Sequence, residues 1–403
     1  MQIAGDTDLG LRARRAERAR WNGVDRARAR AAWLVFVRDV FFPFVVTRLL
    51  LGIVAIIATA ALPLSPWIPA SWLRPGLLPV LDAFSRWDGL HYVDIAQSGY
   101  GATDPTNVAF FPLYPLLMRG GATLTGSVTV QSLELWGIVI SNACLLIAAS
   151  LLVALCRMEF GHRVASRAAW YLLIFPTSFF LSAIYAESLF LALSIGSVLA
   201  ARRGHWLLAG LLGGCAALTR PFGFVVAVPL AVEAALQWRS GQRTWRPAAG
   251  ILAVPTAFAG YLVFLWYQRG DALAFLHVEN GWGRSLTLPW ETFTRFFAQP
   301  ITVNTGLHSA VDLGFAVATI ALAVAAWKLL RPSYALYLSV LVLIPLSSGS
   351  LGSLGRFDVV FFPLILVLAR LGRRPALDRA INVVGIGLGG LLMALFAQWY
   401  WVA

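Results

Sequence analysis

The segment SRWDGLHYVDIAQSGY, which begins at Ser85, holds the side chains of this sequence that are best suited to chemistry. Arg86, Asp88, His91 and Asp94 lie close together in it, between apolar runs typical of membrane-spanning helices. Ionisable groups are costly at a bilayer, so a dense group of them at its boundary indicates a functional site. We therefore expect this segment to lie at the centre of the protein's activity.

The spacing of Asp88 and His91 suits acid–base catalysis. In a helix, positions three apart share a face, whereas the later Asp94 would turn away from Asp88. The carboxylate could take the proton of an acceptor hydroxyl, and the imidazole could orient it or share the work. The alternative is structural, with Asp88 capping a short helix and pairing with Arg86. Both interpretations stay open at the level of sequence.

Further polar residues lie at the ends of later apolar runs. They are Tyr185 and Glu187 in SAIYAESLF, Arg220 in LTRPFG, and Arg356 in GRFDVV. Arginine presents a planar fork of donors that suits phosphate oxygens, so Arg220 and Arg356 are predicted to form a phosphate clamp. Alternatively, these arginines pair with Glu187 and Asp358 as structural ties.

The sequence offers little support for a bound metal or a nucleotide. His277 and Glu279 form a single His-x-Glu pair without a second ligand pair at a useful spacing, so we expect no tightly bound metal. A weak divalent cation site at Asp88 or Asp94 stays open, because carboxylates suit hard cations. Glycine-rich phosphate loops are absent, which argues against a soluble nucleotide substrate.

Composition places the chain among helical membrane proteins. Its 403 residues are 59% hydrophobic and 13% charged, with a mean hydropathy of +0.73. Continuous apolar runs, each long enough to cross about 30 Å of hydrocarbon as a helix, recur along it. We predict an all-α, polytopic membrane protein with about eleven spans, near 41–62, 133–156, 168–184, 188–201, 206–219, 222–237, 248–267, 310–330, 333–347, 357–371 and 381–401.

Charge predicts the orientation. The net charge is +13, and most basic residues lie in the N-terminal tail and in alternate loops, which favours a cytoplasmic N-terminus over nucleic-acid binding. We expect a basic tail at 1–38 and a single membrane domain at 39–403. The outer segments 63–132 and 269–309 are rich in Trp, Phe and Pro, which predicts short helices along the outer interface. The Asp88 segment would then be extracytoplasmic.

These motifs resemble a known family. SRWDGLHYVDIAQSGY followed by NVAFFPLYPLL is similar to the signature of the PIG-V family, the GPI mannosyltransferase II type of membrane glycosyltransferase. The resemblance continues through IFPTSFFLSAIYAESLFLALS and GLLGGCAALTRPFG to GRFDVVFFPL, and so extends over about 85–370. The first two elements are specific, and the later ones gain weight from their order and spacing.

The resemblance implies a GT-C fold, a lipid-phosphate sugar donor and a catalytic acid in the first outer loop, which maps onto Asp88. Its members transfer mannose from dolichyl-phosphate mannose to a glycolipid. Lys328 is the sole lysine beside many arginines, which hints at a GC-rich bacterial genome. We therefore expect a bacterial relative that transfers mannose from polyprenyl-phosphate mannose to a lipid-linked or surface glycan in an inverting reaction.

Three alternatives stay open: a flippase or transporter of lipid-linked sugars, a non-catalytic assembly subunit, and a GT-C enzyme that uses another sugar. The expected partners are the donor, the glycan acceptor and membrane lipid. The expected site has no tightly bound cofactor. Its residues, by role, are Asp88 and His91 for catalysis; Arg86, Arg220 and Arg356 for the donor phosphate; and Trp87, Asp94, Tyr185, Glu187 and His277 for substrate binding.

Overall fold

The computed structural model describes residues 30, 32–73, 79–101, 104–302 and 309–402, and its regular structure there is helical. Most of the expected basic tail at 1–38 lies outside the described residues. Short 3₁₀ helices are labelled η, as is the π-helical turn η1. The first elements are η1 (Val37–Phe41), α2 (Phe42–Ala61), η2 (Ala70–Trp72), α3 (Pro79–Asp82), α4 (Asp88–Ser98), η3 (Pro105–Ala109), α5 (Leu113–Leu124), α6 (Val130–Phe160), α7 (His162–Leu173), η4 (Ser178–Leu181) and α8 (Glu187–Arg202).

The second half continues the helical arrangement. Its elements are α9 (Trp206–Ala217), η5 (Pro221–Val226), α10 (Ala227–Arg239), α11 (Arg246–Arg269), α12 (Ala274–His277), η6 (Val278–Trp282), α13 (Pro289–Phe297), α14 (Ala310–Leu329), α15 (Pro332–Leu346), α16 (Leu354–Asp358), α17 (Phe362–Leu371) and α18 (Pro375–Ala397). The predicted all-α, polytopic architecture is confirmed.

The spans differ in length from those expected. A helix occupies or enters each of the eleven predicted stretches, but only six helices in the described residues are long and apolar enough to cross a membrane. The other stretches hold shorter helices, among them Trp206–Ala217, Pro332–Leu346 and Phe362–Leu371. The six are Ala32–Ala61, Val130–Phe160, Pro221–Arg239, Arg246–Arg269, Ala310–Leu329 and Pro375–Ala397.

The expected span at 168–184 is broken. Helix α7 ends at Leu173, and the chain runs irregularly past Pro176, which cannot continue a helix, before α8 begins. Arg48 of α2 donates to the carbonyls of Leu173 at 2.7 Å and Ser178 at 2.8 Å. Irregular backbone persists inside a membrane protein where its polar groups find partners. Arg48 therefore stabilises the non-α-helical segment that precedes Tyr185 and Glu187.

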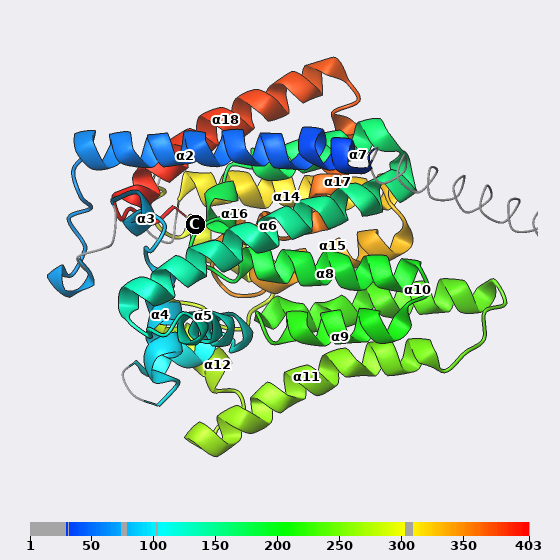
Figure 1. Cartoon of the computed structure of the whole chain (residues 1–403), viewed down its shortest axis with the longest axis horizontal. Coiled ribbons are helices and arrows are strands. Elements are labelled where there is room, and N and C mark those ends of the chain that lie inside the picture. Colours follow the sequence, from blue (N-terminus) through cyan, green and yellow to red (C-terminus); the bar gives the residue numbers. More distant parts are fainter. Residues whose placement is uncertain (1–29, 31, 74–78, 102–103, 303–308, 403) are drawn as a thin grey trace, which may run out of the picture.

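Helix α8 forms the centre of the bundle. Nearly all of its residues are buried, and it packs between α6 and α9 (Figure 1). A helix that is apolar on all sides belongs in the interior of a bundle. Glu187, the first residue of α8, is completely buried even though it is charged. The fold thus places an acidic side chain at one end of its most enclosed helix.

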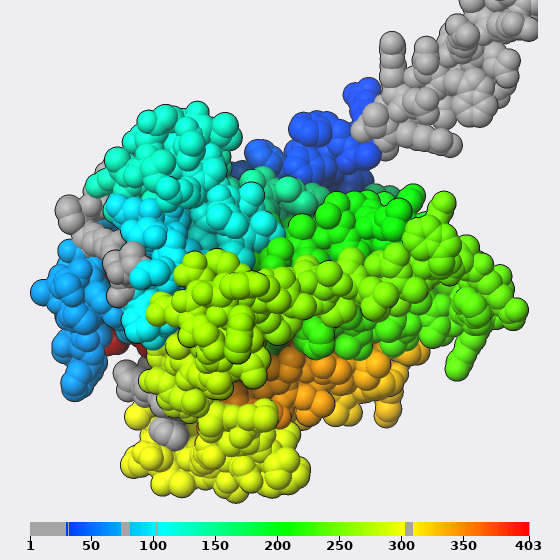
Figure 2. Space-filling view, turned by 90° about the horizontal axis from the view of Figure 1, so that it is seen from below, coloured from blue at the N-terminus to red at the C-terminus, as the bar shows by residue number. Residues whose placement is uncertain are grey.

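The segments 63–132 and 269–309, which were expected to lie outside the membrane, gather at one end of the molecule. Helices α3, α4, α5 and α12 lie together there, with the C-terminal end beside α16 (Figure 1). The segments touch where η3 contacts α12 and η6. They form one continuous surface at this end, with α4–α5 in cyan and the second segment in yellow-green to yellow (Figure 2). The short helices expected in 63–132 and 269–309 are present.

Helices α9 and α11 approach each other closely through small residues. A Cβ on Gly250 of α11 would lie 2.5 Å from the carbonyl oxygen of Trp206 on α9. On the same helix, Gly260 has open space around it. Small residues at helix contacts let backbones approach in membrane bundles. Gly250 therefore sets the distance between these two helices.

We expect Gly250→Ala to lower stability, because the added methyl group must push α9 and α11 apart at a cost of about 1–3 kcal/mol. The measurement is the thermal unfolding midpoint of the intact protein in detergent. Gly260→Ala is the matched control, and it should leave the midpoint unchanged or raise it through alanine's better helix propensity. Equal midpoints for the two variants would contradict this account of the packing.

Candidate active site

Asp88 lies at the start of α4, directly after a strained backbone position. Trp87 has φ +53°, in the left-handed region that residues other than glycine seldom adopt. Such strain costs about 1–3 kcal/mol and tends to occur at functional sites. The Asp88 side chain is 19% exposed, so it is partly enclosed and still accessible. The residue expected to act as the catalytic base is therefore held in a defined orientation at the edge of the bundle.

A chain of alternating charges runs inward from Asp88. Arg356 of α16 donates through Nη1 to Asp88 Oδ2 at 2.5 Å and through Nε to Glu187 Oε1 at 2.5 Å. Arg220, before η5, forms an ion pair with the same Glu187 oxygen. Two carboxylates and two guanidinium groups thus compensate one another. We call these four residues the ion-pair chain.

Burial makes these pairings necessary. Arg220 and Arg356 are 6% and 5% exposed, and Glu187 is fully enclosed. Burial alone would lower the pKa of Arg356, but the charges of Asp88 and Glu187 raise it well above its ordinary value. The Arg356 guanidinium also lies over the Tyr185 ring, 4.6 Å from its centroid. A buried charge that is neither paired nor hydrogen-bonded is strongly destabilising, so the four side chains depend on one another.

The alternative prediction, in which Arg220 and Arg356 form structural ion pairs with Glu187 and Asp358, is correct for Glu187 only. Both arginines pair with Glu187, whereas Asp358 accepts a hydrogen bond from Thr319 instead of pairing with Arg356. Tyr185 contributes its ring to Arg356 and donates its hydroxyl to the carbonyl of Arg86 at 3.0 Å.

His91 belongs to a second polar group. Its Nδ1 lies 2.8 Å from Asn107 Oδ1, and the Asn107 amide donates to Asp94 Oδ2 at 2.8 Å. The imidazole also stacks on Phe110, with centroids 4.5 Å apart, and lies 3.7 Å from Asp104. The structure therefore links His91 to Asp94 through Asn107, whereas helical spacing predicted that His91 would lie with Asp88 and that Asp94 would turn away. Asn107 was missed, although it opens the NVAFFPLYP element.

Arg86 and Trp87 face the C-terminal end of the chain. Arg86 donates to the carbonyl of Ala397 at 3.4 Å and lies over the Trp399 ring, 4.7 Å from its centroid. Trp87 packs edge-on against Trp399 and Trp401. Burial lowers the pKa of Arg86 to about 10, so the guanidinium stays charged at neutral pH. Trp399 could not be predicted as a neighbour of Trp87, because nothing in the C-terminal apolar run indicates contact with residues so far away in the chain.

His277 lies apart from the ion-pair chain, on the second outer segment. It pairs with Asp271 at 2.7 Å, and both side chains are well exposed. Glu279 pairs with Arg284 at 3.1 Å. Within the described part of the chain, no group of three or more His, Cys, Asp or Glu side chains is arranged to hold a metal ion.

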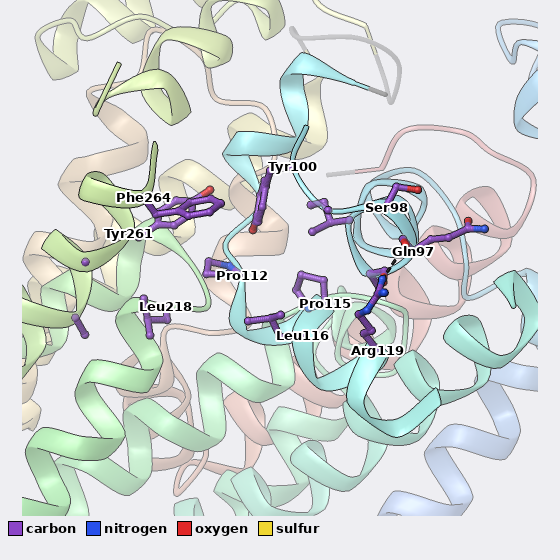
Figure 3. Close-up of a pocket in the computed structure, with 15 residues that line it drawn as sticks. Gln97, Ser98, Tyr100, Pro112, Pro115, Leu116, Arg119, Leu218, Tyr261 and Phe264 are labelled. Carbon is purple, nitrogen blue, oxygen red and sulfur yellow. Dashed lines mark hydrogen bonds between the residues drawn. The ribbon is translucent and has the colours of Figure 1, made fainter. Parts of the chain in front are cut away.

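A groove of about 790 Å³ lies beside the C-terminal end of α4. Tyr261 and Phe264 of α11 form one wall, and the start of α5, around Pro112 and Leu116, lies across from them (Figure 3). The lining is mainly apolar. Arg119 stands at one end and donates to the carbonyl of Gln97 at 2.8 Å (Figure 3). This size is within the range of small-molecule sites.

Comparison with known proteins gives one family match and several relatives. A family model described as "Mannosyltransferase (PIG-V)" matches residues 31–237, about half of the chain. The mouse GPI alpha-1,6-mannosyltransferase 2 is 35% identical over 175 residues, which cover 40% of this chain and 33% of that protein. The rat protein of the same name is 33% identical over 159 residues, or 36% of this chain and 30% of that protein. The chain thus matches about a third of the length of these relatives.

Solved structures with a similar arrangement are oligosaccharyltransferases of Archaeoglobus fulgidus. One, a complex with Zn and sulfate, has a TM-score of 0.45 and 14% identity, covering 89% of this chain and 53% of that chain. Another, the enzyme AglB with an inhibitory peptide and a dolichol-phosphate, has a TM-score of 0.44 and 13% identity, covering 89% and 56%.

We expect Glu187→Gln to destabilise the protein strongly, because it leaves Arg220 without an anionic partner and Arg356 with only Asp88. Breaking a buried ion pair typically costs about 3–5 kcal/mol. The thermal unfolding midpoint in detergent measures the effect. Glu279→Gln is the matched control, since its carboxylate is 25% exposed and pairs with a single arginine, so its loss should cost less than that of the enclosed Glu187. Similar losses in both variants would show that Glu187 has no special role.

Proposed function

The chain belongs to the PIG-V family of mannosyltransferases, and we propose that it transfers mannose from polyprenyl-phosphate mannose to a lipid-linked or surface glycan acceptor. We place the reaction on the extracytoplasmic side of the membrane, with the N-terminus in the cytoplasm. The GT-C fold and a bacterial plasma membrane belong to the same proposal. So does the absence of a tightly bound cofactor, with a weak divalent cation at Asp88 or Asp94 still open.

The observation that carries the proposal is that the Asp88 carboxylate is both oriented and accessible. One oxygen, Oδ2, is held by Arg356 at 2.5 Å, while part of the side chain remains exposed at the outer end of the bundle. The fold therefore fixes the direction of the carboxylate without burying it. A general base needs this combination, since it must be within hydrogen-bond reach of the proton that it removes.

In the proposed reaction, Asp88 takes the proton of the acceptor hydroxyl while that oxygen attacks the anomeric carbon of mannose. The bond from this carbon to the phosphate oxygen breaks, positive charge develops on the sugar ring, and the configuration inverts. The lipid phosphate leaves already ionised, so it needs fixed positive charge nearby and no general acid. Arg356 orients the base. His91 and Asp94, joined by Asn107, lie three and six positions along the same helix and are proposed to contact the acceptor.

The groove beside α4 supports a lipid-borne substrate. Asp88 is the first residue of this helix and Ser98 the last, so at 1.5 Å per residue the two ends are about 15 Å apart. The groove lies at the far end, and its aromatic and aliphatic lining suits an isoprenoid chain. We propose that the tail of the donor lies there, which leaves its sugar at the start of α4.

We expect Asp88→Asn to reduce mannose transfer by about 10²–10⁴-fold, the usual contribution of a general base. The measurement is transfer of labelled mannose from polyprenyl-phosphate mannose, using purified protein and membranes that lack it. Folding should survive, because Arg356 keeps its contact with Glu187.

Asp378→Asn is the matched control. Asp378 lies near the start of α18, at the opposite end of the bundle, and the asparagine oxygen can still accept the hydrogen bond from Tyr171 (Figure 1). This variant should transfer mannose at the wild-type rate. More than half the wild-type rate in Asp88→Asn would remove Asp88 as the base. Movement of labelled lipid across vesicles without any new glycosidic bond would favour a flippase.

Arg356→Lys should lower the transfer rate by about tenfold or more while leaving the protein folded. A lysine keeps the positive charge but has no planar fork, so it cannot hold Asp88 and Glu187 together as the guanidinium does. Loss of a hydrogen bond to a charged group is worth about 1.5–3 kcal/mol, which corresponds to at least that factor. A wild-type rate would mean that Asp88 needs no orientation by Arg356.

A further inference from the structure

Beside Asp88 lies an arginine without a carboxylate partner. No ion pair links Arg86 to an acidic side chain in the described residues, and its one hydrogen bond is the long contact with the carbonyl of Ala397. Arg220 and Arg356, in contrast, are both occupied by carboxylates. Of the three arginines expected to hold a phosphate, Arg86 is therefore the one without a carboxylate at ion-pair distance in the described residues.

Two indole N–H groups near Arg86 also lack an acceptor. Nε1 of Trp87 and Nε1 of Trp399 are both buried and make no hydrogen bond, and their rings are 6.0 Å apart. Trp399 is 1% exposed. Leaving such a donor buried and unpaired costs about 1–3 kcal/mol. Both residues have positive φ values, 53° for Trp87 and 64° for Trp399, so the backbone is also strained where it presents them.

Arg86, Trp87 and Trp399 share one chemical property, since each side chain can only donate hydrogen bonds. A sugar hydroxyl both donates and accepts, so it would find no acceptor among these three side chains. A phosphate oxygen only accepts, and arginine donors suit it in both charge and geometry. Trp87 directly precedes Asp88, so an anion held here would lie next to the proposed base.

We propose that Arg86, Trp87 Nε1 and Trp399 Nε1 form a binding site for the phosphate of a lipid substrate, an inference that rests on the proposed function. We call these three groups the donor cluster. The lipid is either the polyprenyl-phosphate donor or a phosphate-bearing glycolipid acceptor, because both present the same chemistry.

A purely structural role makes a different prediction. Arg86 could serve only to tie the C-terminal end down, through Ala397 and the face of Trp399. Substitutions would then lower stability and leave lipid affinity unchanged. Affinity for a phosphate, compared with affinity for the same lipid lacking it, separates the two roles.

The test measures binding of polyprenyl phosphate, polyprenol and phosphatidylinositol to the full chain in maltoside detergent micelles, which carry no phosphate. Trp399→Phe keeps a smaller aromatic ring and removes the N–H, and Arg86→Gln removes the charge. Each variant should bind the phosphate-bearing lipid about tenfold or more weakly, the loss expected for one hydrogen bond to a charged group. Polyprenol, which has no phosphate, should bind all variants equally.

Trp401→Phe is the matched control, because the ring of Trp401 contacts Trp87 at 5.1 Å but its N–H is not among the buried donors without partners. Its affinities should equal those of the wild type. A loss seen with polyprenyl phosphate assigns the site to the donor, and a loss seen only with phosphatidylinositol assigns it to the acceptor. Because both Trp399→Phe and Arg86→Gln are measured, the inference can still be tested if one of them fails to fold.

Unchanged affinities in folded variants, or no saturable binding of either phosphate lipid by the wild type, would overturn the inference. Equal losses for polyprenol and polyprenyl phosphate would overturn it too, since the phosphate would then make no difference. Mannose transfer by the wild type is assayed separately. Transfer that persists alongside unchanged affinities would therefore reject the donor cluster and leave the proposed function intact.

Discussion

The structure depends on one enclosed carboxylate, Glu187, which bridges two buried arginines. Arg220 and Arg356 come from segments far apart in the chain, and neither can stay in the interior without an anion. Arg356 then reaches outward to Asp88, so the orientation of an accessible carboxylate follows from a pairing made deeper in the bundle. The break between α7 and α8 is part of the same arrangement, because it places Glu187 at the end of the central helix.

The charged residues of the site could be predicted from the sequence, but their partners could not. Asp88, Glu187, Arg220 and Arg356 stand out because charges are rare in apolar runs, and all four lie in one connected group. Their partners depend on distance in space, so the link of His91 to Asp94 through Asn107 and the approach of Trp399 to Trp87 were not visible. The helical class followed from hydropathy. The break at 174–186 was missed because its residues are as apolar as those of a continuous span.

Two kinds of polar chemistry lie on either side of Asp88. The ion-pair chain is internally compensated in charge, with two carboxylates and two guanidinium groups. The donor cluster has no carboxylate at ion-pair distance in the described residues, and its two indole N–H groups lack acceptors. This division agrees with a reaction in which one side of the site must keep a base fixed while the other receives an anion. It also separates residues that hold the fold together from residues available for binding.

Arg48 has a consequence for how the chain enters a membrane. A central arginine weakens the insertion of a helix by about 2.5–3.5 kcal/mol, which the apolar remainder of α2 must outweigh. Its acceptors, the carbonyls of Leu173 and Ser178, are synthesised much later, after α6. During translation α2 therefore carries an unsatisfied charge until α7 arrives beside it. Full pairing of the Arg48 side chain therefore requires α7 and the segment that follows it.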